Sequence, residues 1–204
     1  TSSLTDLQRL LHICELELYW LDMSINTSKS CCLRFGPRFD NHCCSIITTS
    51  GLPLPWVNEL RCLGIYILKA RCFKCSFDHA KRAFYRALNA IFGKIGRSAS
   101  EEVILQLVSS KCLPVLMYAS EACGLNKSDT RSLDFPVNRF LMKLFKTANS
   151  VIIQDCLAYF EFKLPSSLIV GRTRNFLAKY YECDNCICKL FRNVSYTDVI
   201  TSSI

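Results

Sequence analysis

The residues of this sequence that could do chemistry are concentrated in one basic segment. Residues 69–97 contain eight lysines and arginines and one acidic residue, Asp78, so the segment has a net charge of +7 in a chain of net charge +8. Each cation of such a segment can neutralise a phosphate group, and an amide can donate a hydrogen bond to one. The candidate phosphate contacts are Lys81, Arg82, Arg86, Asn89, Lys94 and Arg97.

This segment also has the periodicity of an amphipathic helix. Over residues 76–95 one stripe carries the apolar side chains of Phe77, Ala80, Phe84, Leu88, Ile91 and Ile95. Arg82, Arg86 and Asn89 lie on the opposite face, and Arg97 would join them if the helix continued. A helix of this kind either binds a polyanion, most commonly nucleic acid, or is an ordinary solvated surface helix. Both interpretations stay open.

Two cysteine clusters raise the question of a zinc site. They are Cys72-x-x-Cys75-x-x-x-His79 and Cys183-x-x-Cys186-x-Cys188. A structural zinc ion needs four converging ligands, which usually come from two pairs close in sequence. These clusters lie far apart, so we favour chance spacing in a chain of fourteen cysteines and assign no metal ligand.

No self-contained active site is visible. The three histidines, His12, His42 and His79, fall in different segments, and no serine has the G-x-S-x-G setting of a hydrolase. The sequence has no glycine-rich phosphate loop. The adjacent carboxylates of Glu101 and Glu102 stand at an expected helix start, where the helix dipole explains them.

Composition indicates a globular chain. With 50% hydrophobic and 21% charged residues among 204, it is not an intrinsically disordered protein. No apolar run approaches the ~20 residues of a membrane-spanning helix, and the polar start has no secretory signal. We therefore expect an intracellular protein, cytoplasmic or nuclear, without membrane contact. Its cysteines are expected to be reduced and packed as small hydrophobes, for example Cys14, Cys62, Cys112, Cys123 and Cys156.

The elements divide into a strand-containing start and a helical remainder. A helix is expected over 4–20, and strands are expected over 31–35, 44–49 and 60–68, the last interrupted by Gly64. Later helices are expected over 76–95, 100–118, 128–147, 150–161 and 167–182, with Pro114 bending or ending the second. The fold class is therefore α+β, with a small antiparallel strand and helix region followed by helices only.

Three stretches follow one another in an informative order. The first is the opening helix followed by LDMSINTSKSC (residues 21–31), and the second is LRCLGIYI (residues 60–67). The third is FKCSFDHAKRAFYRALNAIFGKIGRSASEEVILQLVSSKCLPVLMYASEAC (residues 73–123). In this order and spacing they resemble the last part of the reverse transcriptase of non-LTR (LINE-type, jockey-like) retrotransposons. The resemblance covers residues 4–180.

The resemblance implies a role for each stretch. Asn26-x-x-Lys29 matches the palm motif behind the catalytic aspartates, and Lys29 matches a lysine thought to assist the leaving pyrophosphate. Leu63 and Gly64 match the primer-grip hairpin, which holds the 3′ end of the primer. The third stretch matches the thumb, which tracks the template–primer, so an RNA–DNA or DNA duplex is the implied partner. The implied domains are the end of the palm (1–69), the thumb (70–149) and a C-terminal helical extension (150–204).

The sequence departs from this family in two respects. The residue before Leu63 is commonly aromatic there, and here it is Cys62. The paired aspartates that hold two metal ions are expected just before Leu4, and neither they nor the three-stranded fingers are present. Nucleotide transfer depends on those metals. We therefore expect no cofactor here, Mg²⁺ only in a full-length parent, and no polymerase activity of this chain alone.

Our prediction from the sequence is a fragment of an RNA-directed DNA polymerase that retains its grip on the template–primer duplex. One alternative is a non-enzymatic, basic, helical nucleic-acid-binding module, in which residues 70–150 alone would bind as well. Another is a degenerate retrotransposon relic without function, which would fold poorly. A zinc-binding interaction domain is a third alternative.

Overall fold

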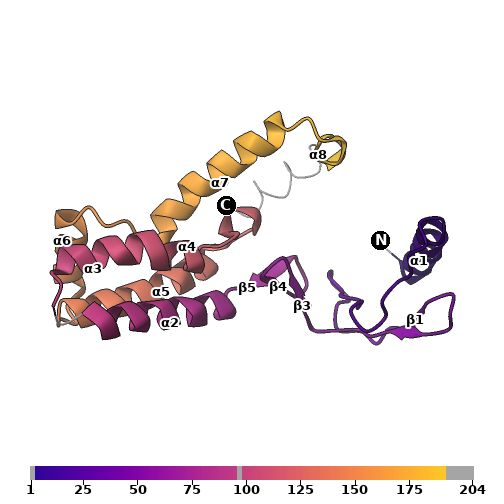
Figure 1. Cartoon of the computed structure of the whole chain (residues 1–204), viewed down its shortest axis with the longest axis horizontal. Helices are drawn as coiled ribbons and strands as arrows, with labels where there is room; N and C mark the ends of the chain where they lie inside the picture. The colour runs from indigo at the N-terminus through magenta and orange to yellow at the C-terminus, as the bar shows by residue number, and fades with distance from the viewer. Residues whose placement is uncertain (1–2, 96–97, 192–204) are drawn as a thin grey trace. The chain divides into compact units, whose positions relative to one another are not determined.

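The computed structural model describes residues 3–95 and 98–191 (Figure 1). The chain divides into two compact units, unit 1 over residues 1–76 and unit 2 over residues 77–204. Unit 1 contains the two small antiparallel sheets and one helix, and unit 2 is helical. The predicted α+β class, with strands early and helices afterwards, is confirmed.

Unit 1 begins with helix α1 (Leu4–Tyr19), close to the predicted range. The Ser3 hydroxyl accepts a hydrogen bond from the backbone N–H of Asp6 at 3.1 Å and so caps its start. Three leucines of its inward stripe, Leu4, Leu7 and Leu11, pack against a small core. That core consists of Cys32, Ile46 and Leu54.

The first sheet pairs β1 (Ile46–Ile47) with β2 (Pro53–Leu54) and is held from one side by α1. The Gln8 carboxamide accepts from the Ile47 N–H at 2.9 Å and also donates to the Ile47 carbonyl. The Glu15 carboxylate accepts from the Thr49 N–H at 3.0 and 3.1 Å. Side chains of α1 thereby satisfy backbone groups that a two-stranded sheet leaves unpaired.

The second sheet has the order β3 (Glu59–Cys62), β4 (Ile65–Leu68) and β5 (Lys74–Ser76), all antiparallel. The single strand expected over 60–68 is therefore wrong, because the chain reverses at Leu63 and Gly64. The strand expected over 31–35 is also wrong, since Cys32 and Phe35 make only isolated bridges, to Trp56 and Ala70. Of the strand expected over 44–49, the chain forms only the two residues of β1.

Unit 2 is built on two long helices and a broken third. They are α2 (Asp78–Ile95), α5 (Lys127–Leu144), and the continuous run of α3 (Glu101–Leu107), π-helix η1 (Val108–Cys112) and α4 (Leu113–Leu116). A short 3₁₀ turn η2 (Ser120–Ala122) precedes α5, and α6 (Ser150–Tyr159), α7 (Pro165–Glu182) and α8 (Cys186–Phe191) follow it. Figure 1 shows α7 extending away from the helices that pack around α5. The fully buried side chains include Phe84, Val108, Leu116, Leu133 and Leu141.

The broken helix shows how Pro114 is accommodated. Proline lacks the N–H that an α-helix needs and clashes with the preceding turn. The chain widens into the π-helical turn η1 directly before it and then continues to Leu116 as α4. The helix expected over 100–118 is therefore confirmed as one run, with the irregular turn before Pro114 rather than an end at it.

The cysteines divide between the interior and the surface. All fourteen are free thiols, and Cys32, Cys75, Cys112 and Cys123 are buried. The expectation that Cys14 and Cys62 are packed as small hydrophobes is wrong, because both are exposed. Cys14 lies a turn beyond Leu11, where the contact of α1 with the core ends, and Cys62 adjoins the exposed turn at Leu63. Burial raises the pKa of the Cys112 thiol, so this thiol stays protonated and unreactive at neutral pH.

Within residues 3–95 and 98–191, no helix combines the length and apolar character that crossing a membrane requires.

Candidate nucleic-acid interface

Helix α2 has the two faces that its sequence predicts. Phe84 and Leu88 are buried at 0% and 6% exposure, whereas Arg82, Arg86 and Asn89 are exposed. At 100° per residue these three polar residues lie within about 60° of one another. The exposed face of α2 therefore offers two arginines and one amide, which we call the α2 ridge (Arg82, Arg86 and Asn89).

Two other lysines of α2 do not belong to the ridge. The half-buried Lys81 ammonium lies 3.3 Å from the Asp78 carboxylate and donates a hydrogen bond to the Ser132 hydroxyl of α5. It therefore links α2 to α5 instead of facing solvent. Lys94 is exposed, but it lies about 140° around the helix from Asn89. Arg97, the last of the six predicted contacts, lies outside the described residues.

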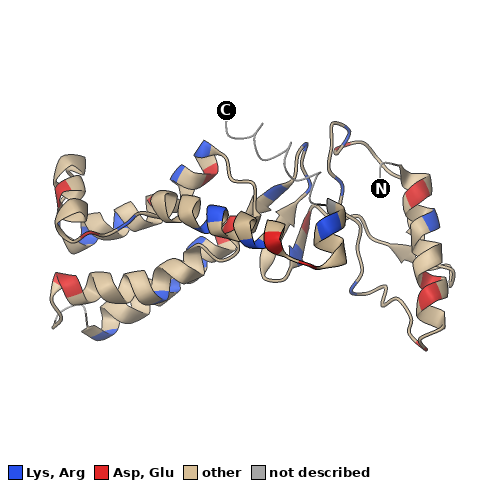
Figure 2. Ribbon diagram, turned by 90° about the horizontal axis from the view of Figure 1, so that it is seen from above, with Lys and Arg blue, Asp and Glu red and all other residues tan. Residues whose placement is uncertain are grey.

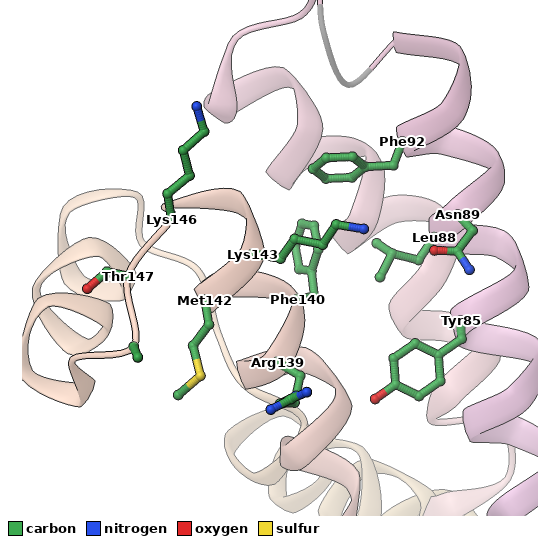
Figure 3. Close-up of a pocket in the computed structure, with 11 residues that line it drawn as sticks. Tyr85, Leu88, Asn89, Phe92, Arg139, Phe140, Met142, Lys143, Lys146 and Thr147 are labelled. Atoms are coloured by element: carbon green, nitrogen blue, oxygen red, sulfur yellow. The ribbon is translucent and has the colours of Figure 1, made fainter.

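A groove of about 790 Å³ runs between α2 and α5 (Figure 3). From α2 it is lined by Tyr85, Leu88, Asn89 and Phe92. From α5 and the turn after it, the lining residues are Arg139, Phe140, Met142, Lys143, Lys146, Thr147 and Ala148. The floor is apolar because Leu88 and Phe140 are buried, and the Phe92 and Phe140 rings meet edge to face with centroids 6.0 Å apart.

Three cations of the groove, which we call the α5 cations, come from α5 and from the turn directly after it, and none was among the predicted contacts. Arg139 and Lys143 are four residues apart on α5, so they share one face of the helix, and Lys146 follows two residues after the helix ends. The Lys143 ammonium lies 5.4 Å from the centroid of the Phe92 ring, in a cation–π arrangement. Lys146 adopts the left-handed conformation, with φ of 53°, at the end of the helix, where the Thr147 N–H donates to the Met142 carbonyl at 3.1 Å.

The lining of the groove contains three cations and no carboxylate. In Figure 2, basic positions recur along the helices of unit 2. Acidic side chains of α5, such as Asp129 and Asp134, are used elsewhere: Asp129 closes a capping box with Asn126, and Asp134 accepts from the Ser166 N–H at 2.9 Å. The groove therefore attracts anions without a competing charge of opposite sign.

A separate candidate site in unit 1 is the turn between β3 and β4. Cys62 pairs with Ile65, so Leu63 and Gly64 form a two-residue hairpin turn. Both have positive φ, 48° and 85°, as a type I′ turn requires. Gly64 adopts this conformation without cost, but leucine does not. The Leu63 side chain is nevertheless 87% exposed at the tip, so packing does not explain why it is there.

We expect Leu63→Asn to stabilise this hairpin, because asparagine tolerates a left-handed conformation that costs leucine about 1 kcal/mol. The cross-strand amides of β3 and β4 should then exchange hydrogen about fivefold more slowly. Hydrogen-exchange NMR measures this rate. Leu52→Asn, at an exposed leucine without positive φ, is the control and should leave the rate unchanged. Equal or faster exchange in Leu63→Asn would show that the turn is not strained.

Lys29 lies in a tight turn of unit 1. The Asn26 carbonyl accepts from the Lys29 N–H at 3.1 Å, and the Asn26 side chain accepts from the Ser28 N–H at 3.1 Å. Asn26 thus folds the turn through its own side chain and leaves Lys29 exposed. This geometry accounts for the Asn-x-x-Lys spacing locally, and the role of Lys29 in pyrophosphate release stays a prediction.

No metal centre is assembled in the part of the chain that the structure describes. There, no three side chains of histidine, cysteine, aspartate or glutamate are grouped so that they could hold a metal ion. This includes both cysteine clusters considered from the sequence.

No protein-family model, no curated protein and no solved structure matches this chain.

Proposed function

We propose that this chain is the palm-end and thumb part of an RNA-directed DNA polymerase of the non-LTR retrotransposon type. In this proposal, unit 2 holds the template–primer duplex through the α2 ridge and the three α5 cations. The observation that carries the proposal is the groove between α2 and α5, whose lining contains Arg139, Lys143 and Lys146 and no carboxylate. Such a surface suits a polyanion whose backbone is contacted without reading its bases.

The β3–β4 turn supports the same proposal from unit 1. An exposed leucine in a left-handed conformation costs stability, and strain of this kind tends to be kept where a side chain has a function. In the proposed polymerase, Leu63 contacts the 3′ end of the primer, and Gly64 allows the tight turn that presents it. This part of the proposal rests on the resemblance of residues 60–67 together with the strained turn.

The proposal is tested by comparing the affinities of the chain for two RNA–DNA hybrids of equal length and unrelated sequence. Because phosphate contacts carry no sequence information, we expect dissociation constants that agree within about threefold in fluorescence anisotropy. A preference of roughly 1,000-fold or more for one hybrid would indicate base readout and contradict the proposal. Failure to bind either hybrid would contradict it as well.

A further inference from the structure

We propose that the groove between α2 and α5 takes an unpaired nucleotide of a nucleic-acid single strand, with the base on Tyr85 and the phosphate among the α5 cations. This site shares the α5 cations with the proposed duplex contact and differs from it by using Tyr85. The inference rests on the proposed function for nucleic acid as the ligand and for the α5 cations as its phosphate contacts.

The width of the groove argues for a single strand. The groove lies between two helices that contact one another through Lys81 and Ser132 and through the Phe92 and Phe140 rings. The axes of two helices in contact are about 8–10 Å apart. A nucleic-acid duplex is wider than this spacing, because its major groove alone is about 12 Å across. A duplex can rest on the rim of such a groove but cannot enter it. A volume of about 790 Å³ is nevertheless within the range of sites that hold small ligands.

The walls of the groove suit both halves of a nucleotide. Tyr85 is 36% exposed, so part of its ring is open for a base to stack on it, and Figure 3 shows it opposite Arg139. The Asn89 amide makes no hydrogen bond to any described residue, and it can both donate to and accept from the edge of a base. The ammonium of Lys143, held over Phe92 at 5.4 Å, supplies positive charge within the groove.

The groove and the ridge share Asn89, but they can be tested separately by substituting Tyr85 of the groove or the two arginines of the ridge. Tyr85 and Arg86 are neighbours in sequence, but their side chains lie about 100° apart around α2. Tyr85 lines the groove, whereas Arg82 and Arg86 do not. All three are exposed, so their removal leaves the buried face of α2 intact.

The test compares the affinities of the full chain for an oligothymidine single strand and for a blunt-ended RNA–DNA hybrid. We expect Tyr85→Ala to weaken single-strand binding about tenfold and to change hybrid binding less than twofold. Tyr85→Phe keeps the ring and should bind the single strand as the wild type does. The double variant Arg82→Ala, Arg86→Ala should show the opposite pattern, with a larger loss for the hybrid.

The outcomes separate this inference from the proposed function. Single-strand binding that depends on Tyr85, in a chain that does not bind the hybrid, would support the inference and contradict the duplex grip. Hybrid binding that depends on the arginines, with single-strand binding unchanged in Tyr85→Ala, would overturn the inference alone. Equal losses for both ligands in Tyr85→Ala would also overturn it, because the groove would then not be a distinct site.

Discussion

The triple variant Arg139→Gln, Lys143→Gln, Lys146→Gln is expected to bind an RNA–DNA hybrid roughly 100-fold more weakly than the wild type at about 0.15 M salt. Each phosphate contact changes the logarithm of the binding constant by about 0.9 for each tenfold change in salt concentration. If the electrostatic contribution vanishes near 1 M salt, each contact contributes a factor of about five at 0.15 M, and three contacts together contribute about 100. Fluorescence anisotropy with a labelled hybrid measures this loss.

The control for this variant removes the same charge elsewhere in unit 2. Lys163, Arg174 and Lys179 are exposed and do not line the groove. Their replacement by glutamine should change hybrid affinity by no more than about threefold, because exposed charges that do not contact the phosphates are screened by salt. Equal losses in both triple variants would mean that net charge governs binding, and the α5 cations would then have no special role.

Phe84→Ala is expected to destabilise unit 2 by about 3–5 kcal/mol, a large part of the stability of an ordinary domain. The Phe84 side chain is fully buried, and its helix packs against α4 and η1. Removal of the ring therefore leaves a cavity, and the lost transfer free energy adds to the cost of that cavity. Urea denaturation followed by far-UV circular dichroism measures the effect, since seven of the eight α-helices of the described residues belong to unit 2.

Two controls locate this effect. Arg86→Ala lies on the exposed side of the same helix and should shift the free energy of unfolding by no more than about 0.5 kcal/mol. Both tryptophans, Trp20 and Trp56, lie in unit 1, so their fluorescence follows unit 1 separately. The assignment of Phe84 to the core would be contradicted if the urea midpoint, measured by circular dichroism, shifted no more in Phe84→Ala than in Arg86→Ala.

Helix α2 could be predicted from the sequence because the periodic spacing of apolar and basic residues defines both of its faces. The apolar stripe with Phe84 and Leu88 is buried, and the arginines opposite it are exposed. A helix buries one face by geometry, so periodicity is enough to find it. The fate of Lys81 could not be predicted in this way. Its partner Ser132 is 51 residues away in sequence, and only the packing of α2 against α5 brings the two together.

The cations of α5 show a different limit of the sequence reasoning. The segment after residue 97 has little net charge, since carboxylates such as Asp129 and Asp134 offset the basic residues of α5. Counting charge by segment therefore concealed Arg139, Lys143 and Lys146. Counting charge by helix face would have found Arg139 and Lys143, whose spacing of four residues places them together, but not Lys146, which lies beyond the end of the helix.

The β3–β4 hairpin was implied at Leu63 and Gly64 by the family resemblance, but the residue pattern alone predicted a single strand there, for a physical reason. Leucine is a poor residue for the first position of a type I′ turn, which asparagine, aspartate and glycine favour. Leu63 therefore looks like part of a continuous apolar strand, and only Gly64 signals the reversal. The residue pattern fails here because Leu63 adopts a left-handed backbone conformation that leucine does not favour. Such conflicts between sequence and structure are common at functional positions.

The salt dependence of hybrid binding tests the central claim of a duplex grip by α2 and α5 most directly. Five cations take part, namely Arg82, Arg86, Arg139, Lys143 and Lys146. With about 0.9 per contact, the logarithm of the wild-type binding constant should fall with the logarithm of salt concentration with a slope of about −4.5. The slope for the α5 triple variant should be about −1.8. A wild-type slope near zero, or equal slopes for the two proteins, would contradict the claim that these cations hold the phosphates.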